Sequence, residues 1–233
     1  MLARTFLSMR EYEKAALYAD SSLQLQNELM DFNELDLSAT SPIPLYNNEV
    51  IFHINLPGKQ AFSRSRGRID SVLYKSYDQN DIRKRAFFNV LDSNIVNFRG
   101  SYTGTSTLFG GLATDEMYLI RAEGNARKGK VEDALNDLNR LLENRFVTGT
   151  FVPLTASSSE DALQLVLSER KKELLFRGLR WTDLRRLNQE NQFATTIRRV
   201  VNGQEYLLPP NDSRYVFPIP SVVIKNTGMS QNP

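Results

Sequence analysis

Apolar side chains recur at three- and four-residue steps in two separate segments, which predicts amphipathic helices. The first segment covers residues 1–37 and the second covers residues 114–190, each with a tight turn, at Met9–Glu11 and at Lys128–Lys130. When Tyr12 is placed on Val131, an offset of 119 residues (131 − 12), the apolar positions of the segments coincide. The coinciding pairs are Ala3 with Ala122, Ala15 with Ala134, Ala19 with Leu138, and Leu23 with Leu142. The pattern predicts TPR-like helical hairpins, which bury their apolar faces only by stacking.

A third helix is expected to begin near Ser157 in the second segment. Ser157 and Glu160 have the spacing of a capping box, in which both side chains satisfy free N–H groups of the first turn. Gly178 is expected to end this helix in a left-handed conformation, and the apolar spacing from Trp181 onward predicts one more short helix.

The remaining parts of the chain lack helical periodicity. Residues 38–113 are expected to form a long irregular excursion, in which Glu49–Ile54 is a short and largely buried extended segment. Polar residues such as those of Ser63–Arg68 dominate much of the rest. Residues 191–233 include Pro209, Pro210, Pro218 and Pro220, which disfavour helix, and are expected to form an extended tail along the helices. The prediction is a mainly α-helical fold, with residues 1–233 as a single domain.

Composition narrows the function by exclusion. The 233 residues are 41% hydrophobic and 24% charged with a net charge of +2, which gives no reason to expect nucleic-acid binding. Cysteine is absent, so disulfides, thiolate nucleophiles and Cys-ligated metals are excluded. The chain has no apolar run of about 18 residues that would span a membrane. Its N-terminus shows no export signal and no lipidation cysteine.

Several ordered motifs resemble those of the SusD/RagB family. Asp115–Glu123, together with Ala126–Gly129 and Ala134–Asn139, is similar to that family's helical hairpin. The sequence from Glu169 to Arg186 resembles its most distinctive stretch. Further similarities are Asn47–Phe52, Asp81 with Arg83, Phe217–Pro220 and Asn232–Pro233.

The resemblance implies a nutrient-binding lipoprotein on the surface of the bacterial outer membrane, with no cofactor and no enzymatic activity. It implies an oligosaccharide or peptide ligand and a SusC-like TonB-dependent transporter as partner. Membrane association would depend on a lipid anchor that this chain does not carry. Because family members are typically much longer, the chain is expected to be the C-terminal portion of a larger protein.

The charged residues between Glu169 and Arg186 allow two interpretations. Glycoside hydrolysis needs two carboxylates that face one substrate, and Glu169 and Glu173 lie four residues apart on one predicted helix. Neighbouring arginines would neutralise both, so we expect ion pairs that fix helix packing rather than a catalytic site. Trp181, the only tryptophan, is expected in the core.

No metal site or catalytic triad is expected. His53 is the only histidine, and it stands between Phe52 and Ile54, which favours a hydrogen-bonded core or edge position. A zinc site or a Ser-His-Asp triad would depend on this one residue.

An aromatic loop is the candidate ligand site. Phe98, Tyr102 and Phe109 lie near Arg99, and such rings beside hydrogen-bond donors suit a carbohydrate or peptide. The alternative is that these rings pack against the helices. Two other functions remain open: a TPR-type scaffold that binds another protein, and, least favoured, a hydrolase.

Overall fold

The computed structural model describes residues 1–57, 67–92 and 95–232. Residues 63–66 of the polar Ser63–Arg68 stretch, and Pro233 at the end of the last family motif, lie outside this description. The chain divides into two compact units, Met1–Arg180 and Trp181–Pro233, which are described separately below. The expectation that residues 1–233 form one domain stays a prediction.

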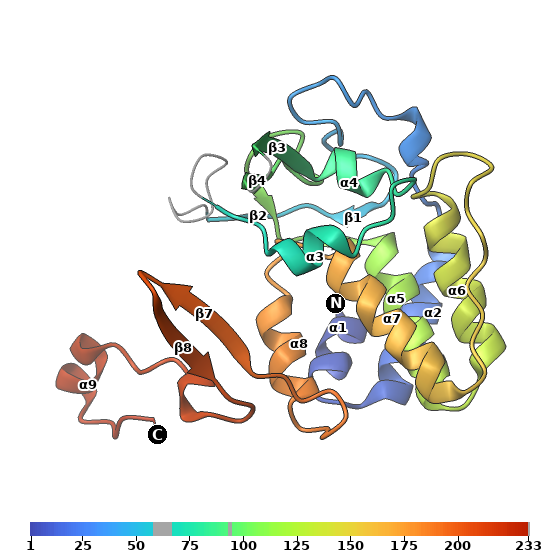
Figure 1. Ribbon diagram of the computed structural model, residues 1–233. Helices are drawn as coiled ribbons and strands as arrows, with labels where there is room; N and C mark the ends of the chain where they lie inside the picture. Colours follow the sequence, from blue (N-terminus) through green and yellow to red (C-terminus); the bar gives the residue numbers. More distant parts are fainter. Residues whose placement is uncertain (58–66, 93–94, 233) are drawn as a thin grey trace. The chain divides into compact units, whose positions relative to one another are not determined.

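Two helical hairpins stand side by side in the first unit (Figure 1). The first consists of α1 (Leu2–Ser8) and α2 (Tyr12–Leu25), and the second of α5 (Thr114–Arg127) and α6 (Val131–Glu143). A short 3-10 helix, η1 (Phe32–Glu34), follows the first hairpin. The mainly helical, TPR-like prediction is confirmed.

The two hairpins superimpose in sequence at the predicted offset. The helices α2 and α6 begin at Tyr12 and Val131, the two residues that were aligned. All eight residues of the four matched pairs are buried. Arg10 and Gly129 occupy equivalent turns and both have left-handed φ angles, 65° and 78°. The repeat therefore extends to the backbone conformation of the turns.

The third helix begins one residue later than expected. It is α7 (Ser159–Glu173), and its N-cap is Ser158, whose side chain accepts a hydrogen bond from the amide of Asp161. The predicted capping box at Ser157 was therefore wrong by one position, because Asp161 supplies the acidic partner three residues after the cap. The helix ends five residues before Gly178, which does adopt a left-handed φ of 75°.

The excursion carries short paired strands and two short helices. The strand β1 (Val50–Phe52) pairs with β6 (Leu112–Ala113), and β2 (Asn55–Leu56) pairs with β5 (Leu108–Phe109). A hairpin is formed by β3 (Phe88–Asp92) and β4 (Ile95–Phe98). The helices are α3 (Ser71–Lys75) and α4 (Arg83–Ala86).

The extended segment Glu49–Ile54 is less buried than expected. Only Glu49 is fully buried, whereas Phe52 and Ile54 are 53% and 48% exposed. The expectation of a largely buried segment was wrong because its strand pairs along one edge with the two-residue β6. A run of apolar residues does not by itself show whether a second layer covers the strand.

The second unit is more ordered than the extended tail that the prolines predict. It contains α8, which spans Arg180–Leu187 across the unit boundary, and a hairpin of β7 (Ile197–Val201) and β8 (Gln204–Leu208). Asn202 and Gly203 close the hairpin with left-handed φ angles, as in a type I′ turn. A 3-10 helix (Ser213–Tyr215) and α9 (Ser221–Thr227) follow.

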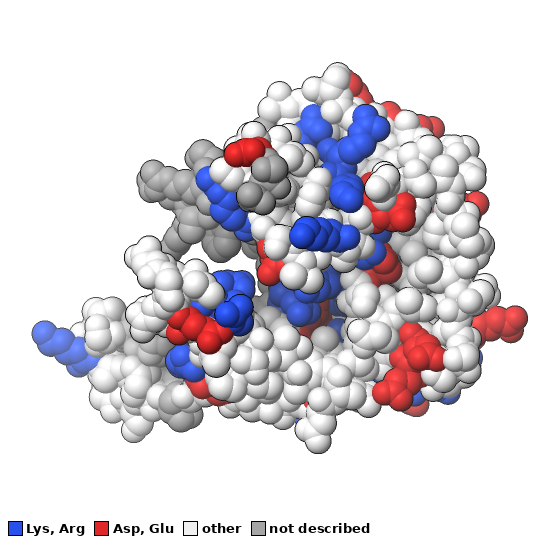
Figure 2. Space-filling model, in the orientation of Figure 1, with Lys and Arg blue, Asp and Glu red and all other residues white. Residues whose placement is uncertain are grey.

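The cores of the first unit differ in composition. The clusters around the helical hairpins consist mainly of Ala, Leu, Ile and Met, whereas the core of the excursion is rich in Phe and Tyr. None of the helices in the described ranges combines the length and the apolar character needed to cross a bilayer. On the face drawn in Figure 2, Lys and Arg side chains gather over α3 and α4.

Candidate functional site

A network of buried charges joins the helices of the first unit to the excursion. Its first centre is Arg145, which lies two residues after the end of α6 and is fully buried. The Arg145 guanidinium donates to Glu173 of α7 (Nε to Oε1, 2.8 Å), to Glu49 of the excursion (Nη2 to Oε1, 2.8 Å) and to the backbone oxygen of Met30 (2.8 Å). One side chain thus holds three distant segments together.

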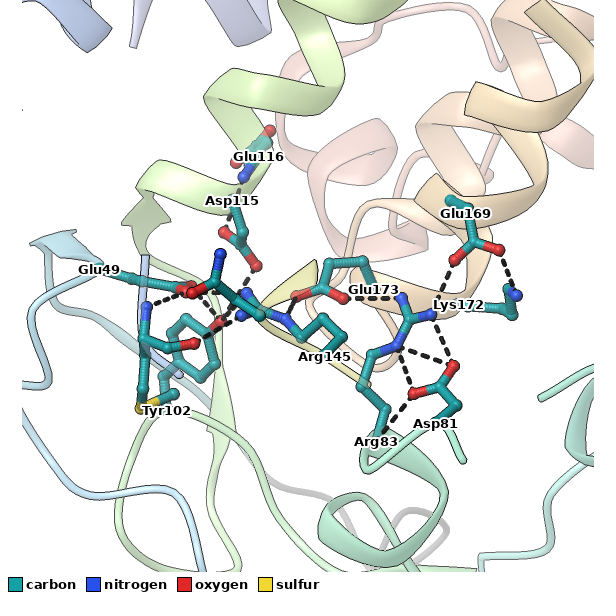
Figure 3. Close-up of polar contacts among 12 residues, drawn as sticks. Glu49, Asp81, Arg83, Tyr102, Asp115, Glu116, Arg145, Glu169, Lys172 and Glu173 are labelled. Carbon is teal, nitrogen blue, oxygen red and sulfur yellow. Dashed lines mark hydrogen bonds and ion pairs between the residues drawn. The ribbon is translucent and has the colours of Figure 1, made fainter. Parts of the chain in front are cut away.

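The second centre of this charge network is Arg83 of α4 (Figure 3). Arg83 is also fully buried, and it lies 2.7 Å from Asp81, 2.8 Å from Glu173 and 2.8 Å from Glu169. Lys172 forms a further ion pair with Glu169. Because Glu173 contacts both Arg83 and Arg145, the two centres form one network. Burial alone would raise the pKa of Glu173, but the neighbouring arginines outweigh it and lower the pKa to about 2.

Tyr102 of the excursion also belongs to the charge network. Its hydroxyl donates to Glu49, and it lies 3.2 Å from Oδ2 of Asp115. Arg177 is paired with Asp115 at 2.7 Å. Burial raises the pKa of Asp115 to about 7 despite Arg177, so this carboxyl is partly protonated near neutral pH.

The geometry of the charge network is that of a structural ion-pair cluster. Oxygens of Glu49, Asp115 and Glu173 lie within 4.8 Å of one another, as in some metal sites. However, Arg145 bonds to two of these carboxylates and Arg177 to the third, so guanidinium groups stand where a cation would. Glu169 and Glu173 are likewise engaged by Arg83 instead of facing a common cleft.

An aromatic chain leads from this network to the surface. The rings of Tyr102 and Phe109 are 5.5 Å apart, Phe109 and His53 are 5.7 Å apart, and His53 and Tyr46 are 5.2 Å apart in a T-shaped contact. Exposure rises along this chain, from 0% for Tyr102 and Phe109 to 71% for Tyr46. The outermost ring is therefore supported from below by fixed rings and open to solvent above.

The turn that presents Tyr46 has an unusual backbone. Tyr46 has a φ of 54°, a left-handed conformation that is uncommon for a bulky residue and costs about 1–3 kcal/mol. Asn47 stabilises the turn, since its side chain donates to the backbone oxygen of Pro44 (3.1 Å) and accepts from the amide of Glu49 (3.1 Å). Gln26 of the first segment donates to the backbone oxygen of Asn48 at 2.7 Å. Strain held by such contacts is typical of functional positions.

Exposed apolar and amide side chains continue from Tyr46 along the same segment. Phe52 and Ile54 are half exposed, and Asn48 and Asn55 are also open to solvent. His53 contacts Asn55 (Nε2 to Oδ1, 3.1 Å), while its Nδ1 has no hydrogen-bond partner among the described residues. A Cβ on Gly111 would lie 2.0 Å from the backbone oxygen of Phe52, so only glycine permits this close approach of β1 and β6. We call Tyr46 and His53, whose rings are in contact, the aromatic platform.

The residues predicted from the sequence lie beneath this platform or away from it. Tyr102 and Phe109 belong to the aromatic chain but have no exposed face. Phe98 is 6% exposed and contacts Phe176 at 4.7 Å in the excursion core. The Arg99 guanidinium donates to three backbone oxygens, those of Leu37, Ala39 and Arg85. The ligand role of these four residues stays a prediction, which in this conformation would require the loop to open.

Sequence reasoning missed Tyr46 as a candidate ligand-contacting residue. A signal was present, because Pro44 and the pair Asn47–Asn48 flank Tyr46 and mark a turn whose side chains point outward.

Trp181 of the second unit is half buried, which is less than the core position expected for it. Its ring stacks on that of Phe217 at 5.8 Å and packs at a tilt on the buried Tyr215 at 4.8 Å. These two rings cover only part of the indole, which explains why Trp181 is not fully buried. The residue type alone therefore did not predict its burial correctly.

Comparison with known proteins supports the sequence resemblance. The profile of the SusD family matches residues 114–233, which contain α5 to α9. The chain belongs to the SusD family. A SusD-like protein, P38, from Formosa agariphila is 28% identical to this SusD-family chain over 138 residues, which are 56% of the chain and 24% of P38.

Solved SusD-family structures share the fold over nearly the whole chain. A SusD superfamily protein from Bacteroides thetaiotaomicron has a TM-score of 0.73 at 21% identity, with 100% of this chain and 59% of that one covered. A SusD-like carbohydrate binding protein from Bacteroides vulgatus has a TM-score of 0.66 at 22% identity, with coverages of 98% and 57%. The surface glycan-binding protein A of Bacteroides uniformis has a TM-score of 0.62 at 16% identity, with coverages of 99% and 59%. The chain thus spans less than two thirds of the length of these relatives.

Proposed function

We propose that this SusD-family chain captures a nutrient glycan without catalysis, at the bacterial outer membrane, for delivery to a TonB-dependent transporter. Family membership supports glycan-binding nutrient capture in general. Two solved relatives are described as carbohydrate-binding or glycan-binding proteins. A SusC-like transporter as partner and a surface location follow from the same family reasoning.

The observation that carries the proposal is the aromatic platform. Tyr46 is 71% exposed while its ring is braced against His53, so the ring is presented without collapsing onto the protein. A flat π-face suits the apolar C–H face of a sugar ring, and nearby amides such as those of Asn48 and Asn55 can bind sugar hydroxyls. An exposed, braced ring beside polar groups is typical of ligand sites.

Affinity electrophoresis tests this proposal. The purified chain is run in native gels that contain a panel of neutral and acidic polysaccharides, with a peptide mixture as a parallel arm. We expect retardation by at least one glycan and a roughly fivefold loss of affinity for Tyr46→Ala, because one stacked ring contributes on the order of 1 kcal/mol. Tyr206→Ala is the matched control, since Tyr206 is an exposed tyrosine of the second unit.

Three outcomes would count against the proposal in different ways. Retardation that Tyr46→Ala and Tyr206→Ala weaken equally would show that the platform is not the site. Retention by peptides alone would replace glycan with peptide capture. Release of shortened sugars by the wild-type chain would overturn the non-enzymatic assignment, and Glu169→Gln and Glu173→Gln would then test the carboxylates directly.

A protein partner is the second candidate, favoured by a groove on the helical hairpins. The groove has a volume of about 500 Å³ and lies between α2, α5 and α6. Arg121 lies in its wall between Asp20 and Asp137, at 2.6 Å from each. Such mixed charges on a TPR-like surface suit a polar peptide segment. Stable co-purification of a partner that Arg121→Ala abolishes, without glycan binding, would favour this function.

A further inference from the structure

Positive charge is concentrated on one side of the first unit. In Figure 2, Lys and Arg side chains gather over α3, α4 and the end of α7. The contributing residues come from three helices, of which α7 is distant in sequence from α3 and α4. We call them the basic face; they are Lys75, Lys84, Arg85, Lys171 and Lys172. The formal net charge of +2 for the whole chain gives no hint of this local excess.

Tyr77 brings the three segments together. Its hydroxyl donates to the backbone oxygen of Lys172 on α7 at 2.8 Å, and the Lys172 ammonium lies 5.6 Å from its ring. The ammonium of Lys84 on α4 donates to the backbone oxygen of Tyr77 at 3.0 Å, and it also lies 5.2 Å from the half-buried ring of Tyr74. The basic face is therefore built on a fixed arrangement of helix ends.

Several of these cations have no acidic partner in the part of the chain that the structure describes. Lys172 is paired with Glu169. Lys75, Arg85 and Lys171 are exposed and form no ion pair within the described ranges. Asp70 is the nearby acid, but it caps α3 by accepting from the amides of Val72 (2.8 Å) and Leu73 (3.0 Å).

The pKa of Lys171 reflects this local excess of positive charge. Partial burial of the Lys171 side chain and the neighbouring Arg180 lower the pKa of Lys171, and Asp70 offsets only part of the effect. An anion bound beside Lys171 would relieve the repulsion between these two cations. Lys75, Arg85 and Lys171 of the basic face thus offer exposed donors that no described acidic side chain neutralises through an ion pair.

We propose that the basic face binds the carboxylate or sulfate groups of an acidic polysaccharide. The inference rests on the proposed function and names its ligand class. A polymer with regularly spaced anions contacts several cations in succession, so weak individual contacts add up in one molecule. The half-buried ring of Tyr74 beneath Lys84 adds an apolar surface against which a sugar ring packs.

Polysaccharides that differ only in charge provide the test. The probes are polygalacturonate, alginate and chondroitin sulfate, each compared with its methyl-esterified form, which for chondroitin sulfate is also desulfated. We expect the chain to bind at least one acidic polymer, to lose that binding when the polymer is neutralised, and to bind more weakly as salt rises.

Charge-removal variants locate the contact. Lys75→Gln with Lys171→Gln is expected to weaken binding by roughly tenfold or more, because each removes a charge-assisted hydrogen bond. The control is Lys14→Gln with Lys130→Gln, which removes the same net charge from exposed positions elsewhere in the first unit. We expect less than a twofold change for the control, and circular dichroism and melting curves confirm that each variant is folded.

The outcomes separate the basic face from the aromatic platform. Binding of neutral glycans alone, lost in Tyr46→Ala but unchanged in Lys75→Gln with Lys171→Gln, would overturn this inference and leave glycan capture intact. Binding of an acidic polymer that is lost in the lysine variant supports the inference, whatever Tyr46→Ala does. Equal weakening by the control pair would show non-specific attraction and overturn it. Binding to vesicles of phosphatidylglycerol without binding to any polymer would assign the face to a membrane surface instead.

Discussion

The helical hairpins and the excursion of the first unit are stabilised in different ways. The hairpins bury small and aliphatic residues that recur along the chain, such as Ala15 and Ala134. The excursion buries an aromatic core and is fastened to α5 and α7 by the charge network. Local periodicity therefore specifies the hairpins, whereas single long-range ion pairs position the excursion and the aromatic platform that it carries.

This difference has a consequence for robustness. Each apolar side chain of a hairpin is one of many that pack in the same way, so the others still define the packing when one is truncated. Replacing an arginine of the charge network leaves buried carboxylates without a partner, and unpaired buried charge is among the costliest changes in a protein. We expect substitutions in the network to affect the excursion more strongly than the hairpins.

The largest effect is expected for Arg145→Met. The variant removes the hydrogen bonds to Glu49, Glu173 and Met30 and should lower the free energy of unfolding by about 3–5 kcal/mol. Urea unfolding measures the decrease, and hydrogen exchange should show loosening of residues 38–113 before the hairpins. Lys14→Met, which breaks an exposed pair with Glu11, is the control and should leave the free energy of unfolding nearly unchanged, because solvent screens such pairs. Equal decreases in both variants would contradict the comparison.

The next effect concerns pH and Asp115. Because its pKa is raised from 3.8 to about 7 in the folded protein, the folded state binds a proton that the unfolded state has released between about pH 4 and 7. Stability from this group is complete below pH 4 and falls as pH rises to 7, with a slope of up to about 1.4 kcal/mol per pH unit. Urea unfolding at pH 5, 6, 7 and 8 measures it, and Asp115→Asn should flatten the fall. A slope that Asp115→Asn leaves unchanged would show that another group causes it.

A smaller effect is expected where the two hairpins touch. A Cβ on Gly124 of α5 would lie 2.5 Å from the Ala16 Cβ of α2, so Gly124→Ala should cost about 1–3 kcal/mol through overpacking. Higher helix propensity offsets about 1 kcal/mol of that cost. Adding Ala16→Gly should relieve part of the overpacking. Strictly additive effects in the double variant, measured by urea unfolding, would mean that the two residues do not interact.

The smallest effect tests the repeat itself. Arg10 stands in the left-handed turn position that Gly129 occupies in the second hairpin. Arg10→Gly should therefore stabilise the chain by up to about 1 kcal/mol, which raises the melting temperature by about 2–4 °C. Gly129→Arg should have the opposite sign. A fall in melting temperature for Arg10→Gly would show that the Arg10 side chain contributes more than the turn strain costs.

Much of the helical part could be predicted because the residues that specify a helix or a turn lie close together in the sequence. The offset between the hairpins, the start of α2 and α6, and the structural character of the charges from Glu169 to Glu173 all follow from residue types at short spacing. The excursion was harder, because Tyr102 is an ordinary loop tyrosine in sequence. Only its contact with Glu49, 53 residues earlier, makes it part of the charge network.

The sequence alone determined the family, the helical hairpins and the turns between them. Helical periodicity and turn residues depend on positions only a few residues apart, so they can be recognised without the tertiary structure. The tertiary structure decided which aromatic ring faces solvent. Phe109 and Tyr102 are buried and Tyr46 is exposed, although all three stand in similar polar loops. It also decided that a chain with a net charge of +2 gathers Lys and Arg side chains over α3 and α4 on the face drawn in Figure 2. The exposure of a side chain and the local electrostatic potential depend on which distant segments come into contact, and the spacing of residues along the chain does not specify those contacts.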